Sequence, residues 1–106
     1  MKIIGITACP TGIAHTYMAQ ESLEKELARR GFEYKVETQG GLGIENELTP
    51  EDIKSADVAI LAVSIMIEGE ERFEDIPVVH AEVDRAIKDV EALVDEAIAL
   101  VVNEVK

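Results

Sequence analysis

Two short apolar runs, residues 3–8 and 58–63, are the clearest pattern along the chain. Each run is continuous rather than alternating, which is typical of a parallel strand buried on both of its faces. Gly5 lies inside the first run, and a glycine within a strand indicates that a neighbouring element packs closely against it. The pattern therefore predicts two central strands of a parallel sheet.

Two further strands are predicted from weaker patterns. Residues 33–38 alternate between polar and apolar side chains, which indicates a strand nearer the sheet edge. The apolar side chains of Tyr34 and Val36 are expected to point inward, and charged neighbours such as Glu37 are expected to point outward. Residues 76–79 form a last short strand.

Two long segments have apolar residues at helical spacing. In residues 14–30 the apolar positions recur every three or four residues, and Gly31 follows as a stop signal. A second stripe runs from residue 81 to the C-terminus. Asp89 interrupts this stripe and is a candidate N-cap, so the segment is either one long helix or two shorter ones.

A short helix completes the predicted order of elements. Thr49 and Pro50 have the residue types preferred at a helix N-cap and first position. The resulting alternation of strands and helices predicts a single open α/β domain of three layers with a parallel sheet. Because the carboxyl ends of parallel strands share one sheet edge, the loops 39–47 and 64–75 are expected to converge on Cys9.

The charge and composition exclude several classes of function. The chain of 106 residues has 22 acidic and 10 basic side chains and a net charge of -12, which argues against nucleic-acid binding and against attraction to an anionic membrane surface. The longest apolar run, residues 58–67, is about half of the ~20 residues that a membrane-spanning helix needs, so no direct membrane insertion is expected. A single cysteine excludes an internal disulfide and suits a reducing cytoplasm.

Cys9 stands between the first predicted strand and the first predicted helix. A thiol at a helix N-terminus has a lowered pKa and reacts as the thiolate, whereas the alternative is an inert small core residue. The backbone N–H groups of the following residues also form a cradle for a phosphate, which the hydroxyls of two threonines would complete. The candidate phosphate-binding residues are Pro10, Thr11, Gly12, Ile13, Ala14, His15 and Thr16.

Other site signatures do not occur. The sequence lacks the GxxxxGK[ST] nucleotide loop and the GxGxxG fingerprint, and two distant histidines with one cysteine make a poor metal site, so neither a metal nor another cofactor is expected. A cysteine phosphatase loop of the C-x5-R type would need arginine where His15 stands. The role of His15 stays open between donating to a phosphoryl group and bonding to the backbone.

The motifs of residues 8–16, 36–40 and 45–49 together resemble the fructose-family IIB component of the phosphoenolpyruvate-dependent sugar phosphotransferase system. The resemblance implies that Cys9 accepts a phosphoryl group from a histidine of a IIA protein or domain. It then passes the group to a sugar, with fructose as the default, held by a membrane IIC component. It also implies one IIB domain over residues 1–106, four parallel strands in the order 2-1-3-4 flanked by helices, and a cytoplasmic location peripheral to the inner membrane through IIC.

Three features outside the cysteine motif have open roles. Arg72 and Phe73 match the arginine–phenylalanine pair of the family, so they are candidates for contact with the phosphate or a partner, or Arg72 is a solvated cation. His80 is expected to be structural. The apolar residues 65–67 are either core or an exposed patch that faces IIA or IIC.

Two alternative functions use the same loop. The first is a low-molecular-weight cysteine phosphatase, against which the missing arginine counts. The second is a free-standing regulatory module that is phosphorylated without taking part in sugar transport.

Overall fold

The computed structural model describes residues 1–9, 13–40 and 43–104. The elements in chain order are β1 (Lys2–Ala8), α1 (Ile13–Arg29), β2 (Glu33–Gly40), β3 (Gly43–Glu45), α2 (Pro50–Ser55), β4 (Val58–Val63), the 3-10 helix η1 (Glu70–Phe73), β5 (Val78–Ala81), α3 (Val83–Lys88) and α4 (Val90–Glu104). The alternation of strands and helices confirms the predicted α/β class.

The sheet has five strands in the order β3-β2-β1-β4-β5. β1 pairs in parallel with β2 and β4, and β4 pairs in parallel with β5. These four strands have the expected 2-1-3-4 order, but the prediction of a sheet of four parallel strands is wrong, because β3 adds an antiparallel strand beside β2. Gly43, with a φ of 91°, begins this strand in a region that favours glycine, whereas the sequence pattern predicted only a loop over residues 39–47.

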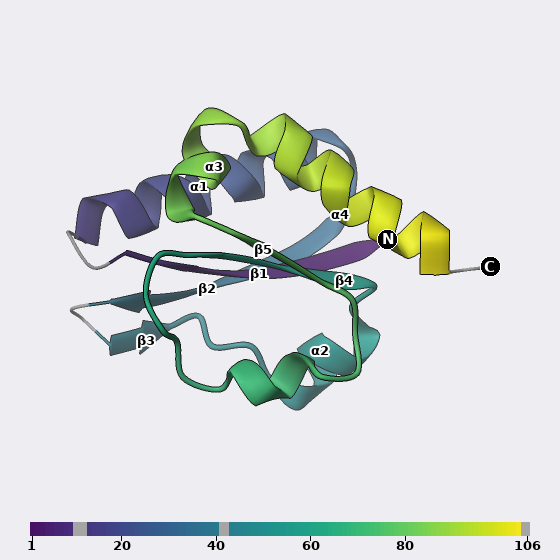
Figure 1. Ribbon diagram of the computed structural model, residues 1–106, viewed down its shortest axis with the longest axis horizontal. Coiled ribbons are helices and arrows are strands. Elements are labelled where there is room, and N and C mark those ends of the chain that lie inside the picture. The colour runs from purple at the N-terminus through teal and green to yellow at the C-terminus, as the bar shows by residue number, and fades with distance from the viewer. Residues whose placement is uncertain (10–12, 41–42, 105–106) are drawn as a thin grey trace.

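Helices cover both faces of the sheet (Figure 1). α1, α3 and α4 lie on one face, and α2 and η1 lie on the other. Each face has its own hydrophobic core, the first built around Leu23, Ile60 and Leu93, and the second around Ile4, Leu61 and Phe73. This three-layer arrangement leaves the carboxyl ends of the parallel strands accessible.

Local signals in the sequence account for most element boundaries. Gly31 has a φ of 78° directly after α1, and Thr49 forms a capping box with Asp52 at the start of α2. The C-terminal stripe is divided at Asp89, where the backbone leaves the helical region between α3 and α4. A Cβ atom on Gly5 would lie 3.0 Å from the carbonyl oxygen of Ile60, so the predicted close approach of a neighbour is confirmed.

The prediction for β2 is wrong for one charged side chain, and one apolar side chain is less buried than expected. Tyr34 lies on the same face as the buried Val36 but keeps 40% of its surface exposed near the start of the strand. Glu37, expected to point into solvent, is 0% exposed. Its charge is compensated inside the protein by Arg72, a partner 35 positions away that no local pattern could indicate.

Candidate functional site

Cys9 lies directly after β1, with 9% of its surface exposed, at the end of the sheet where three connections meet. It lines an open cavity of about 320 Å³ together with residues from the end of β2, the start of β3 and the segment after β4. The remaining lining residues are Gln39, Gly40, Gly43, Ile44, Ile65, Met66 and Glu68. The predicted convergence of these loops on the cysteine is therefore confirmed.

The start of α1 follows the cysteine closely. Pro10, Thr11 and Gly12 of the predicted phosphate loop lie outside the described residues, and Ile13 is the first residue of the helix. The first N–H groups of any α-helix have no partner within the helix, and they form the positive end of its dipole. A thiolate or a phosphoryl group on Cys9 would be next to this positive end.

Ala14 and His15 are exposed in the first turn of α1, and the His15 ring lies at the thiol. The distance between the Cys9 Sγ and the His15 Nδ1 is 3.9 Å, within reach of a weak hydrogen bond to sulfur. The imidazole can accept the thiol proton or, when protonated, donate to an anion on the sulfur.

Thr16 is buried, and its backbone carbonyl and its side-chain hydroxyl have different roles. Its carbonyl oxygen accepts a hydrogen bond of 3.0 Å from the Thr7 hydroxyl, which fixes the start of α1 against β1. Its own hydroxyl oxygen is buried and has no hydrogen-bond partner among the described residues. Gly40, which lines the Cys9 cavity, lies next to this hydroxyl, because a Cβ atom added to Gly40 would be 3.9 Å from the Thr16 Oγ1. Buried hydroxyls are nearly always hydrogen-bonded, which makes this one a candidate ligand donor.

Arg72 is held by a buried carboxylate. Its Nη1 and Nη2 each lie 3.0 Å from an oxygen of Glu37, and its guanidinium lies 5.2 Å from the centroid of the Phe73 ring. Phe73 itself is buried in the core beneath α2. Arg72 is therefore not a solvated cation, and its contact with a phosphate or partner stays a prediction.

Glu37 is a site residue that sequence reasoning missed. Burial raises the pKa of its carboxyl, but the hydrogen bonds from Arg72, Gln39 and the Leu48 N–H outweigh burial, so the pKa lies below its usual value. The one signal in the sequence was that Glu37 and Gln39 stand next to the glycine-rich loop at the end of β2.

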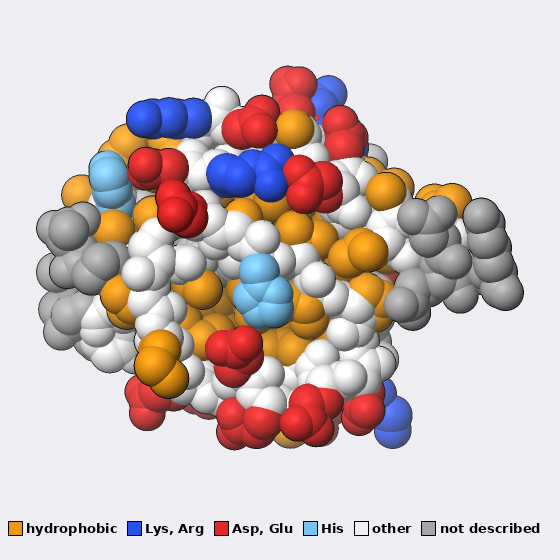
Figure 2. Space-filling view, in the orientation of Figure 1, with side chains coloured by type: hydrophobic (Ala, Val, Ile, Leu, Met, Phe, Trp, Pro, Cys, Tyr) orange, Lys and Arg blue, Asp and Glu red, His pale blue; other side chains and the backbone are white. Residues whose placement is uncertain are grey.

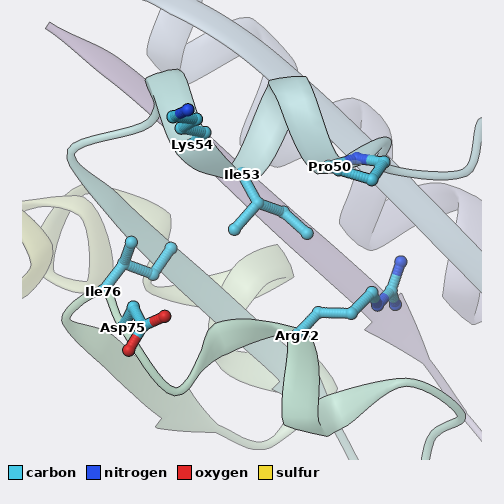
Figure 3. A pocket seen from close by; sticks show the side chains of 6 residues that line it. All are labelled: Pro50, Ile53, Lys54, Arg72, Asp75 and Ile76. Atoms are coloured by element: carbon cyan, nitrogen blue, oxygen red, sulfur yellow. The ribbon is translucent and has the colours of Figure 1, made fainter.

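A second cavity of about 510 Å³ lies between α2 and η1 (Figure 3). Ile53 and Ile76 supply apolar lining, Asp75 lies beside Ile76, and the Arg72 guanidinium lies at the opposite end. Pro50 and Lys54 complete the lining. This cavity is larger than the one at Cys9, and Cys9 is not among its lining residues.

The apolar segment after β4 divides between core and surface. Ile67 packs against the core beneath α2, whereas Ile65 and Met66 are 37% and 96% exposed at the Cys9 cavity. His80 lies on β5, is largely exposed, and has its Nε2 3.4 Å from a carboxylate oxygen of Glu70.

Acidic side chains gather along the lower margin of the face shown in Figure 2, near α2 and η1. Over α3 and α4 they alternate with basic ones, and Arg85 pairs there with Glu96 and Asp89. Among the described residues, no group of three His, Cys, Asp or Glu could hold a metal ion. In the same parts of the chain, no helix has the length and apolar character needed to cross a membrane.

Comparisons with known proteins agree on one family. The family model described as "PTS system, Lactose/Cellobiose specific IIB subunit" matches residues 4–96. The chain is 50% identical over 95 residues to "PTS system fructose-like EIIB component 2" of Escherichia coli K12, covering 90% of each protein. It is 40% identical over 103 residues to "PTS system fructose-like EIIB component 1" of the same strain, covering 97% of this chain and 95% of the relative.

Solved structures give the same result. A domain of the fructose-specific IIABC component from Borrelia burgdorferi superposes with a TM-score of 0.87 at 47% identity, covering 91% of both chains. A predicted fructose-specific IIB from Escherichia coli superposes with a TM-score of 0.90 at 38% identity, covering 94% of this chain and 88% of the other. The chain therefore belongs to the IIB family of the sugar phosphotransferase system (PTS), among its fructose-like members.

Proposed function

We propose that Cys9 carries a phosphoryl group from a phosphohistidine of IIA to a sugar held by membrane IIC. The observation that carries this proposal is the environment of the thiol. Cys9 lies between β1 and the start of α1, His15 lies 3.9 Å from its sulfur, and the buried Thr16 hydroxyl has no partner among the described residues. Fructose or a related sugar is the proposed acceptor, because the relatives are named fructose-like.

The first transfer exchanges a P–N bond for a P–S bond. The Cys9 thiolate attacks the phosphorus atom, and the bond to the donor histidine nitrogen breaks with its electron pair staying on that nitrogen. The thiol proton passes beforehand to His15 or to water. Backbone N–H groups at the start of α1 and the Thr16 hydroxyl stabilise the charge that develops on the phosphoryl oxygens.

The second transfer regenerates the thiolate. A hydroxyl oxygen of the sugar attacks the phosphorus atom, the S–P bond breaks, and the hydroxyl proton passes to a base beside the sugar. In this proposal, residues 1–106 act as one IIB domain in the cytoplasm. Because IIC holds the sugar in the membrane, the domain is peripheral to the inner membrane through its contact with IIC.

The main experiment follows the phosphoryl group. The chain is incubated with labelled phosphoenolpyruvate, the general phosphotransferase proteins and a fructose-type IIA. We expect label on the wild type, none on Cys9→Ser, and discharge of the label when IIC membranes and fructose are added. An unlabelled wild type, or equal labelling of Cys9→Ser, would refute the proposal. Label that no sugar discharges favours the regulatory module, and rapid hydrolysis of an aryl phosphate favours the phosphatase.

Thr16→Val tests the phosphate cradle separately. The substitution replaces a hydroxyl that has no protein partner among the described residues, so we expect little loss of stability. Labelling of Cys9 should slow by about tenfold if the hydroxyl donates to the phosphoryl group, in line with ~1.4 kcal/mol for one such bond. A labelling rate within twofold of the wild type would remove Thr16 from the cradle.

A further inference from the structure

The Gln39 side chain joins the end of β2 to the segment that follows β4. Its Nε2 donates to the Glu37 carboxylate at 2.7 Å and to the Glu68 carbonyl oxygen at 2.9 Å, and its Oε1 accepts from the Glu68 N–H at 2.8 Å. The amide group thus pairs with the backbone of Glu68 as a neighbouring strand would. Gln39 is 6% exposed, and both residues line the Cys9 cavity.

Arg72 fixes the same segment from its other side. Its Nη2 donates to the Glu68 carbonyl oxygen at 3.3 Å, and its Nε donates to the Gly69 carbonyl oxygen at 2.7 Å. The side chain folds closely over Gly69, where a Cβ atom would lie 2.5 Å from the Arg72 Nε. Gly69 also has a φ of 76°, so two independent features favour glycine there.

Glu37, a residue of β2, connects these contacts to the sheet. Its carboxylate accepts from both terminal nitrogens of Arg72, from Gln39, and from the Leu48 N–H at 2.8 Å. A buried ion pair is usually a poor source of stability compared with apolar residues of the same volume. Its directional bonds, however, can hold a backbone segment in one position, which apolar contacts do less specifically.

We propose that Glu37, Gln39 and Arg72 are positioning residues for phosphoryl transfer. Together they hold the segment 64–69 as one wall of the Cys9 cavity, and this proposal rests on the proposed function. Ile65 and the 96% exposed Met66 belong to that wall, so they are available for contact with a protein that docks at the thiol. Releasing the wall therefore weakens productive docking of the phosphodonor while leaving the thiol itself in place.

Gln39→Leu is the direct test, because it removes the bonds to Glu68 and keeps the Glu37–Arg72 pair. We expect the Glu68 amide to exchange hydrogen at least tenfold faster. We also expect the KM for the IIA phosphodonor to rise at least fivefold, with a smaller change in kcat. Gly69→Ala is the second variant, since it displaces Arg72 without removing a polar group, and it should act in the same direction.

Glu26→Gln is the matched control. Glu26 is also a buried carboxylate paired with arginine, at the end of α1, and it belongs to no wall of the Cys9 cavity. Its variant should lose stability but keep the phosphodonor KM within twofold. A KM within twofold of the wild type in both Gln39→Leu and Gly69→Ala, or an equal rise in Glu26→Gln, would overturn the proposal.

A failure of the proposed function would be visible separately. If the wild type takes no label, phosphoryl transfer is excluded for this chain. The positioning claim is then decided by alkylation of Cys9 with a bulky maleimide relative to iodoacetamide. Gln39→Leu should raise this ratio at least threefold over the wild type and over Glu26→Gln, and an unchanged ratio would overturn the claim.

Discussion

Glu37→Gln should cost this domain a large share of its stability. The carboxylate is 0% exposed and accepts two bonds of 3.0 Å from Arg72 and one of 2.8 Å from the Leu48 N–H. Removing one partner of a buried ion pair typically costs ~3–5 kcal/mol, because the other charge stays behind without compensation. Arg72 keeps 22% of its side chain exposed and can turn partly toward water. We therefore expect a loss at the low end, about 3 kcal/mol.

The assay is urea unfolding followed by circular dichroism at pH 7, at constant salt. A domain of this size has a total stability of ~5–15 kcal/mol, so the midpoint should fall clearly while the slope stays the same. A loss below about 1 kcal/mol would mean that the buried pair has no more value than a surface ion pair, and the reasoning would be refuted.

The pH dependence gives a second and independent check. The pKa of Glu37 is below its usual value of 4.5 in the folded protein. The unfolded chain therefore binds more protons as the pH falls below 4.5, and the stability that Glu37 contributes is lost in that range. The difference between wild type and Glu37→Gln should be complete above pH 5 and should shrink as the folded carboxyl is protonated. A difference that stays constant down to the acid transition would contradict this.

Three other outcomes follow from local geometry. Gly5→Ala should destabilise the protein by ~1–3 kcal/mol in urea unfolding, because its methyl group meets the Ile60 carbonyl oxygen, a backbone atom that cannot move aside. Thr49→Ala should lower stability by ~1 kcal/mol in the same assay by removing the acceptor for the Asp52 N–H, whereas Thr49→Ser should retain most of it. The Glu26 pKa is lowered to about 2, chiefly by a hydrogen bond from Arg29, so Glu26 stabilises the fold above pH 4.5 and loses this effect as the pH falls toward 2. Glu26→Gln should make the free energy of unfolding depend less on pH between pH 4.5 and pH 2. An unchanged pH dependence in this range would contradict the lowered pKa of Glu26.

Local sequence signals predicted the parts of the fold that depend on few residues. The continuous apolar strands, the glycine after α1 and the Thr49 cap each involve neighbours in the sequence, and the structure confirms them. The β3 strand and the burial of Glu37 depend on contacts that close only in the folded chain. A glycine-rich loop and a short hairpin share the same composition, and an alternating pattern cannot show that a charged residue finds a buried partner 35 positions away.

The candidate site was likewise predictable where it depends on local sequence signals and on the topology of the sheet. Cys9 follows a strand and precedes a helix, and parallel topology brings the later loops to the same edge. The role of Gln39 was not predictable, because its amide pairs with the backbone of Glu68 through bonds that depend on the exact approach of two loops.

The short β3 strand has a consequence for self-association. The unpaired edge of a sheet can template pairing with another chain, and β3 blocks the end of β2 against this. Further along the same edge, the side-chain amides of Gln20 and Asn46 each donate to the Val36 carbonyl oxygen at 3.0 Å. These contacts occupy a backbone group that a second molecule would need. A three-residue strand and two amides thus oppose aggregation along an edge that ends beside Cys9.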